Sequence, residues 1–293
     1  MNRKFAIRLV AVMVLFYSCH EVKSNDGIKT KLNDVQKEGL KGKVKSVKEH
    51  SYEAIDKDGE VQKGKIYSYK EEIFNEKGNK IEEDFNYLNG SVNTKTIFKR
   101  DNNDYLIESN VYNTDGSLES KATIKNDSMG NKIEINNYKP ADKLAYKHTY
   151  KYDYKGNDIE ENHYKADGSF AFKTTFKYDD KGNKIERNRY KLDGSLDNKQ
   201  TSKNDEKGNQ IQVINYKSDS SIIYKTEKKY DEYGNVLEEK GYGIDQDGTK
   251  HDVEGFIKYE YDSYGNWIKQ ILYNDEGKGK TPETVTEREI IYY

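Results

Sequence analysis

The chain has 293 residues, of which 33% are hydrophobic and 35% are charged, and its mean hydropathy is −1.13. This composition excludes a large apolar core of the usual globular kind, and it would favour disorder if the polar residues were not regularly spaced. The 50 basic and 52 acidic residues nearly cancel, which excludes the positive surface typical of nucleic-acid-binding proteins.

The first 18 residues have the features of a secretory leader. A basic segment, residues 1–8, precedes the apolar run Leu9–Tyr17, which is too short to span a bilayer. Ser18 and Cys19, the single cysteine, follow this run and resemble a lipobox, in which the cysteine becomes the lipidated mature N-terminus. We therefore predict a signal peptide over residues 1–18 and a lipid on Cys19. The alternative is a plain secretory signal with an incidental cysteine.

Three parts follow from this prediction. Residues 1–18 are the leader, residues 19–38 are the lipidated N-terminus with a flexible polar tether, and residues 39–293 are a repeat domain. Without the leader 47 basic and 52 acidic residues remain, a net charge suited to solubility. The expected location is the cell envelope, with the protein held by its lipid to the outer membrane on its periplasmic or surface face.

Internal repetition dominates residues 39–293. Gly-Asn pairs recur at 26-residue steps, with a degenerate copy at Asp104-Tyr105 and a longer last step, and their glycines are Gly78, Gly130, Gly156, Gly182, Gly208, Gly234 and Gly265. A second turn signal, (Asn/Asp)-Gly-Ser, alternates with the first and has its glycines at Gly90, Gly116, Gly168 and Gly194. Two turns per repeat, separated by segments rich in β-forming residues, predict β-hairpins.

We therefore expect an all-β fold in which tandem 26-residue hairpins form an extended antiparallel meander, twisted or curled. A wide flat sheet is unusual, and curling would shelter one face. Lengthened hairpin tips are expected at residues 54–64 and 243–255, and the final strand, Val285–Tyr293, is a candidate to close the sheet.

The columns of the stacked repeats predict two faces of different chemistry. One face carries lysine columns, such as Lys147 and Lys173, with glutamates that follow an isoleucine column in the return strand. Pairing of Phe176 with Ile185 would place the isoleucines on the other face. That face would be aromatic and aliphatic, and it would carry two further columns. The first column is Val92, Leu118, Leu144, Phe170, Leu196 and Ile222. The second column is Phe98, Ile124, Tyr150, Phe176, Ser202 and Lys228. Because the lysines and glutamates cancel, we expect no nucleic-acid partner.

The turn motif also resembles a known repeat. Tyr-Asp-x-x-Gly-Asn, which begins at Tyr152, Tyr178, Tyr230 and Tyr261, resembles the YD repeat of the Rhs family, although Asn replaces the usual Arg. Together with Gly42–Val47 and the end of the chain, it makes residues 39–293 similar to small Rhs/YD-type lipoproteins of Bacteroidetes. In large Rhs proteins such repeats enclose a toxin. This chain has too few repeats for such a shell, so the resemblance implies a scaffold.

No motif predicts catalysis, a cofactor or a metal site. His148 and His163 belong to one hairpin region but lack ligand companions at metal-site spacing. The turn aspartates lack the alternating ligand series of calcium loops, and turn chemistry explains them. Carboxylates are so frequent that no pair stands out. We therefore expect no enzyme.

What remains is surface chemistry. The candidate binding face is the richest aromatic cluster, which consists of Tyr146, Tyr150, Tyr152, Phe170, Phe172, Phe176 and Tyr178. If it is exposed, this cluster could stack on sugars or dock a protein. The alternative is that these residues form the core. The sequence thus predicts a non-catalytic envelope lipoprotein that acts as a binding or scaffold module for a protein or carbohydrate ligand. The alternatives are a structural spacer of the envelope and a toxin-associated or immunity-type protein of an Rhs-like system.

Overall fold

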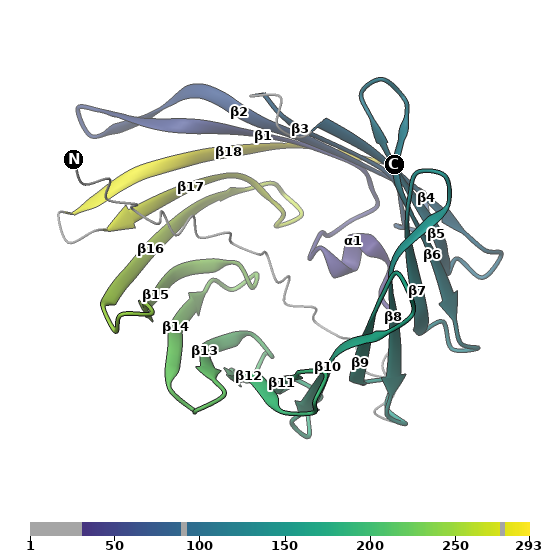
Figure 1. Ribbon diagram of the computed structural model, residues 1–293. Coiled ribbons are helices and arrows are strands. Elements are labelled where there is room, and N and C mark those ends of the chain that lie inside the picture. Colours follow the sequence, from purple (N-terminus) through teal and green to yellow (C-terminus); the bar gives the residue numbers. More distant parts are fainter. Residues whose placement is uncertain (1–30, 89–92, 276–278) are drawn as a thin grey trace, which may run out of the picture.

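The computed structural model of the protein describes residues 31–88, 93–275 and 279–293. Within these ranges the chain forms 18 antiparallel strands and one short helix. Each strand pairs with its neighbours in the sequence, and β1 also pairs with β18, so the sheet closes into a barrel (Figure 1). The predicted all-β hairpin meander is confirmed, and its curl goes as far as closure. Cys19 and most of the predicted tether lie outside the described residues.

The helix is α1 (Asp34–Lys37). The strands are β1 (Val44–Lys57), β2 (Glu60–Phe74), β3 (Lys80–Tyr87), β4 (Asn93–Arg100), β5 (Leu106–Asn113), β6 (Leu118–Asn126), β7 (Lys132–Lys139), β8 (Lys143–Tyr152), β9 (Asp158–Lys165), β10 (Phe170–Tyr178), β11 (Lys184–Tyr190), β12 (Leu196–Asn204), β13 (Gln210–Lys217), β14 (Ile222–Tyr230), β15 (Val236–Ile244), β16 (Lys250–Tyr261), β17 (Trp267–Asp275) and β18 (Lys280–Tyr292). The long β1–β2 and β15–β16 hairpins match the predicted tips, and β18 closes the sheet as predicted.

The Gly-Asn turns all stand at one end of the barrel, called here the Gly-Asn end, because each joins an even-numbered strand to the next odd-numbered one. In one of them, Asp153 Oδ1 accepts hydrogen bonds from the backbone N–H groups of Lys155 (2.9 Å) and Asn157 (2.8 Å). Asn157 Nδ2 donates to Asp153 Oδ2 at 2.7 Å, and Gly156 has φ +80°. The turn itself therefore uses this carboxylate, as the turn chemistry predicts.

The tyrosine of the Tyr-Asp motif ties neighbouring hairpins together. Tyr178 Oη donates to the backbone carbonyl of Asp158 at 2.7 Å, and Tyr152 Oη donates to that of Lys132 at 2.9 Å. Both carbonyls lie 20 residues earlier, on the preceding hairpin. Asn204 Nδ2 makes the equivalent bond, to the carbonyl of Lys184, where the tyrosine is missing. In this fold the motif is therefore part of the scaffold.

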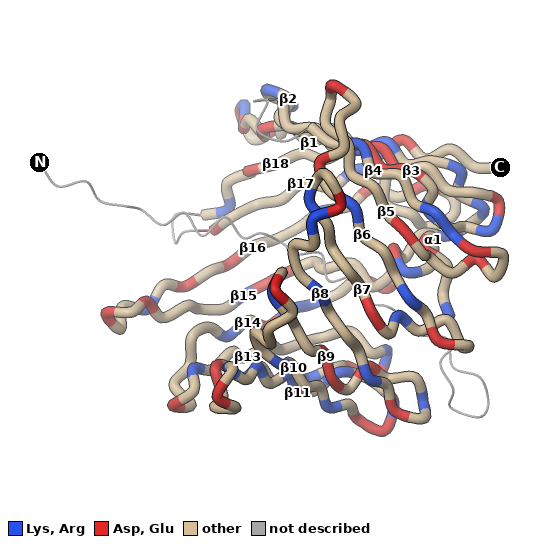
Figure 2. Tube along the Cα trace, turned by 45° about the vertical axis from the view of Figure 1, so that its right-hand side comes forward, with Lys and Arg blue, Asp and Glu red and all other residues tan. Residues whose placement is uncertain are grey.

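The two faces of the sheet can be assigned from α1, which lies inside the ring of strands (Figure 1). Val35 of α1 is buried against Val47 and Phe74, so these strand residues point inward. Following the register from strand to strand then places the lysine columns outside, where Lys151 pairs with Glu160 at 2.7 Å. Basic and acidic residues intermingle along the strands (Figure 2), and cross-strand Lys–Glu ion pairs confirm the predicted Lys/Glu lattice.

The prediction for the opposite face was only partly right. Phe176 pairs with Arg187 and not with Ile185, because a bulge at the Gly-Asn end inserts the isoleucine as an extra residue. Side chains of this isoleucine column are 36–39% exposed at Ile81, Ile107, Ile133, Ile159, Ile211 and Leu237. A second bulge at the other end turns the column of Leu118, Leu144, Phe170, Leu196 and Ile222 outward, opposite the tyrosines of the lattice face. The inner wall is consequently more polar than expected.

The apolar cluster inside the barrel is small and does not follow the repeat. It consists of Val35, Leu40, Val44, Val47 and Phe74, all at most 8% exposed. These residues hold the segment before β1 against the inner wall. This stretch, residues 31–43, is called here the docked segment. Its first part, residues 31–38, was expected to be a flexible tether.

The docked segment reaches three separate Gly-Asn turns. Asn33 Nδ2 donates to the carbonyl of Lys77 (2.9 Å), and Lys31 Nζ donates to that of Gly130 (3.1 Å). The backbone N–H of Lys41 donates to Asn266 Oδ1 (2.8 Å), and Asn266 Nδ2 donates to the backbone carbonyl of Lys41 (2.9 Å). Gly130 has φ +81°, and a Cβ there would lie 2.3 Å from the Tyr105 ring and 2.7 Å from Lys31 Nζ, so another residue would be strained and would displace these side chains. The segment therefore bridges the Gly-Asn end from within.

In the part of the chain that the structure describes, no helix is long and apolar enough to cross a membrane.

Candidate binding site on the inner wall

On the inner wall of β8–β14 the residue type changes from repeat to repeat. Strand β9 contributes Glu161 and His163 to this wall, whereas the equivalent positions of β11 are Arg187 and Arg189. The register places the two pairs on either side of β10, and all four side chains face the interior of the barrel. This part of the inner wall is the candidate site.

Six of the seven aromatic residues of the predicted binding face lie on this inner wall. Phe170 is the exception, since it pairs with Tyr164 on the outer face. The remaining six do not form one open aromatic surface. Lys184 Nζ lies 3.5 Å above the centroid of the Phe176 ring, and Phe176 is only 8% exposed. Tyr146, at 47% exposure, is the most accessible of the six.

Phe172 is covered from both neighbouring strands. The ring of His163 stacks on it with centroids 3.8 Å apart, and the guanidinium carbon of Arg189 lies 3.7 Å from the Phe172 centroid. His148 lies opposite His163, with ring centroids 4.2 Å apart. Burial and the charge of His163 lower the pKa of His148, which favours its neutral form. The two histidines of the sequence analysis are thus part of an aromatic stack.

Asp158 and Glu161 form a hydrogen-bonded carboxyl pair near this stack. Burial, and then the neighbouring charge of Glu161, raise the pKa of Asp158 to about 7. Burial acts in the same direction on Glu161, but hydrogen bonds with His163 and Asp158 hold its pKa below the usual range. One proton is therefore shared between the two carboxyl groups near neutral pH, which limits their repulsion.

A row of polar side chains continues from Phe176 around the inner wall. Neighbours in this row lie directly opposite one another on adjacent strands, in the order Phe176, Arg187, Gln200, Asn215 and Tyr224. Burial raises the pKa of Tyr224, so its phenol stays protonated, although the ring is 38% exposed. The row thus offers a guanidinium, two amides and a hydroxyl to the interior.

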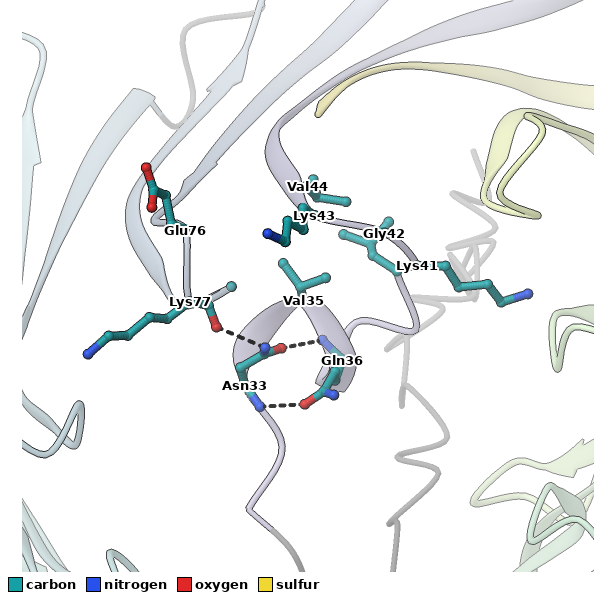
Figure 3. A pocket seen from close by; sticks show the side chains of 11 residues that line it. Asn33, Val35, Gln36, Lys41, Gly42, Lys43, Val44, Glu76 and Lys77 are labelled. Carbon is teal, nitrogen blue, oxygen red and sulfur yellow. Dashed lines mark hydrogen bonds between the residues drawn. The ribbon is translucent and has the colours of Figure 1, made fainter. Parts of the chain in front are cut away.

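No group of three or more His, Cys, Asp or Glu side chains that could hold a metal ion occurs among the described residues. Elsewhere, a pocket of about 300 Å³ lies beside α1 and the β2–β3 turn. Figure 3 shows Asn33 and Gln36 capping each other there, while Val35 points towards Val44. The polar groups of Asn33 and Gln36 hydrogen-bond to each other, and Asn33 also bonds the carbonyl of Lys77. These groups therefore hold α1 in place and are not available to a ligand.

Sequence reasoning missed the polar half of the inner wall. It relied on columns that stay constant, and these proved to be turns, bulges and the outer lattice. Arg187, Arg189 and Glu161 stand in columns where the residue type changes in every repeat, and Asp158 stands where neighbouring repeats have lysine. The variability of the column was the signal for Arg187, Arg189 and Glu161, and the break in a run of lysines was the signal for Asp158.

Comparison with known proteins gives only distant similarities. No family model matches the chain, and no curated protein matches it. Among solved structures, a porin-like protein from Bacteroides uniformis aligns at 10% identity over 85% of this chain and 98% of its own, with a TM-score of 0.45. A porin-like protein from Bacteroides vulgatus aligns at 13% identity over 85% of this chain and 98% of its own, with a TM-score of 0.32.

A Photorhabdus luminescens Tc holotoxin pore is similar at 12% identity and a TM-score of 0.34. The match covers 80% of this chain but only 15% of the toxin chain. At TM-scores below 0.5 these similarities assign neither a family nor a function to the protein.

Proposed function

We propose that the protein is a non-catalytic lipoprotein of the cell envelope, anchored through Cys19, that binds a glycan on the inner wall of β8–β14. The observation that carries the proposal is the chemistry of this wall, where the partly exposed side chains of Tyr146 and Tyr224 share the inner face with amide and charged groups. Glycan recognition needs hydrogen-bond donors and acceptors for hydroxyl groups together with ring faces for the sugar plane.

A glycan fits this wall better than a protein partner does. Protein-docking surfaces need contiguous exposed apolar area, but the rings of Phe172 and Phe176 are covered by cationic neighbours. Tyr146 and Tyr224 are the rings that remain partly exposed, at 47% and 38%. Both lie among polar side chains, which suits a hydroxyl-rich ligand.

A binding role is favoured over hydrolysis by the geometry of the carboxyl pair. Glycoside hydrolases hold their two carboxyl groups roughly 5–9.5 Å apart, on either side of the bond that they cleave. Asp158 and Glu161 instead hydrogen-bond to each other. They therefore leave no room for a glycosidic bond between them.

The test is a glycan array followed by titration calorimetry on the mature full chain. Tyr146→Ala and Tyr224→Ala should each weaken binding about tenfold or more, since loss of one stacking or hydrogen-bonding ring removes roughly 1–2 kcal/mol. Tyr154→Ala is the matched control, because Tyr154 lies in a turn at the Gly-Asn end and is 84% exposed. The proposal fails if no glycan binds, or if all three variants bind alike.

A further inference from the structure

Arg187 occupies a central position in the polar row of the inner wall. It lies between Phe176 on β10 and Gln200 on β12, and all three side chains face the interior. The Arg187 side chain is half-buried, so water screens its charge less than at an open surface. A cation in this setting normally has a carboxylate beside it.

The other arginines of the inner wall have such partners. Arg100 pairs with Asp34, Arg288 Nε lies 2.9 Å from Glu49, and Arg189 Nε lies 3.5 Å from Asp197. By contrast, no ion pair formed within residues 31–88, 93–275 and 279–293 includes Arg187. Its guanidinium is thus the unneutralised charge in an otherwise matched set of arginines.

The neighbours of Arg187 add donors but no acid. Gln200 and Asn215 follow it in the row, and the partly exposed residue Tyr224 ends the polar part. The side chains of Gln200 and Asn215 lie within hydrogen-bonding range of the Tyr224 phenol. Arg187 therefore lacks an acidic partner along this row, which favours a ligand that carries an anionic group.

We propose that the row of Arg187, Gln200, Asn215 and Tyr224 is the subsite for an acidic sugar, whose carboxylate or sulfate is held by Arg187. This inference rests on the proposed glycan-binding function and names its ligand class. A guanidinium binds a planar carboxylate through two parallel hydrogen bonds, and the amides and phenol are placed to bind adjacent hydroxyls. The glycan is accordingly a polyuronate or a sulfated polysaccharide.

The experiment compares an oligouronate with a neutral oligosaccharide of the same length, by calorimetry on the mature full chain. We expect the oligouronate to bind more tightly, and Arg187→Gln to weaken its binding roughly ten- to hundredfold, as loss of a charge-assisted hydrogen bond predicts. Lys177→Gln is the matched control, because it removes the same charge from the outer lattice, where Lys177 pairs with Glu186. A sulfated oligosaccharide in parallel separates the two anionic groups.

The outcomes distinguish this inference from the function on which it rests. Equal binding of the acidic and neutral ligands, or an oligouronate affinity that Arg187→Gln leaves unchanged, would overturn the acidic subsite and leave the glycan-binding function standing. If neither ligand binds to a folded chain, the proposed function fails as well. If Arg187→Gln and Lys177→Gln weaken oligouronate binding equally, the effect comes from the overall charge of the protein, and the subsite is also overturned.

Discussion

The first prediction concerns which apolar residues hold the barrel together. Phe74 is fully buried between the barrel wall and α1, where it contacts a cluster that includes Val35 and Val47. Replacing it by alanine leaves a cavity that α1 cannot fill without moving. Phe74→Ala should therefore lower the free energy of unfolding by about 3–5 kcal/mol.

Ile81 is the matched control. Phe74 precedes the turn between β2 and β3, Ile81 follows it, and Ile81 belongs to the constant isoleucine column. Its side chain is 39% exposed at a bulge, so Ile81→Ala should cost about 1 kcal/mol or less. The periodicity of the sequence alone would rank the two residues in the opposite order.

Equilibrium unfolding in guanidinium chloride measures both costs, with the fluorescence of Trp267, the single tryptophan, as probe. Limited proteolysis adds a local readout, because loss of the Phe74 contact should expose residues 31–43 to protease before the barrel unfolds. If Ile81→Ala costs as much as Phe74→Ala, or if residues 31–43 stay protected, the assignment of the core to the docked segment is wrong.

Three further predictions address the carboxyl pair, the tyrosine tie and the lipid. The pKa of Asp158 is raised from 3.8 to about 7, so the folded state holds this proton more tightly and loses stability as the pH rises through that interval. Asp158→Asn should then unfold at a higher temperature than the wild type at pH 8 but not at pH 4, and identical melting curves at pH 8 would contradict the shared proton. Tyr178→Phe should cost about 0.5–1.5 kcal/mol in denaturant unfolding, because it leaves a backbone carbonyl without its donor. Tyr164→Phe, on the outer lattice, should cost less, and equal costs would mean that the tie contributes nothing. Cys19→Ala should abolish fatty-acid labelling and release the protein from membranes, whereas unchanged labelling would refute lipidation.

The repeat columns predicted the elements of the fold well, because each depends on local chemistry. Asp-x-x-Gly-Asn closes its own turn through bonds such as Asn157 to Asp153, whatever the rest of the chain does. The alternation of Lys147 with neutral residues likewise places the lysines on one face. Hairpin positions, the long terminal hairpins and the outer Lys/Glu lattice therefore follow from the sequence.

The bulges were beyond the reach of simple alternation. One extra residue in each return strand moves Ile185 out of the face on which period-two counting places it, and a second shift turns Phe170 outward. Counting alternate residues from the turn misses both shifts, because each extra residue lies inside the strand. For this reason Phe176 faces the interior, whereas Phe170 lies on the outer face.

What the sequence determined by itself is thus the hairpin, its turns and the charged face, since these are interactions between residues a few positions apart or on adjacent strands. The tertiary structure decided closure, because β1 meets β18 only when the accumulated curvature of all the hairpins brings them together. It also decided the contents of the interior. Closure turned the variable columns inward, where Arg187 and Tyr224 share one row although 37 positions separate them in the sequence.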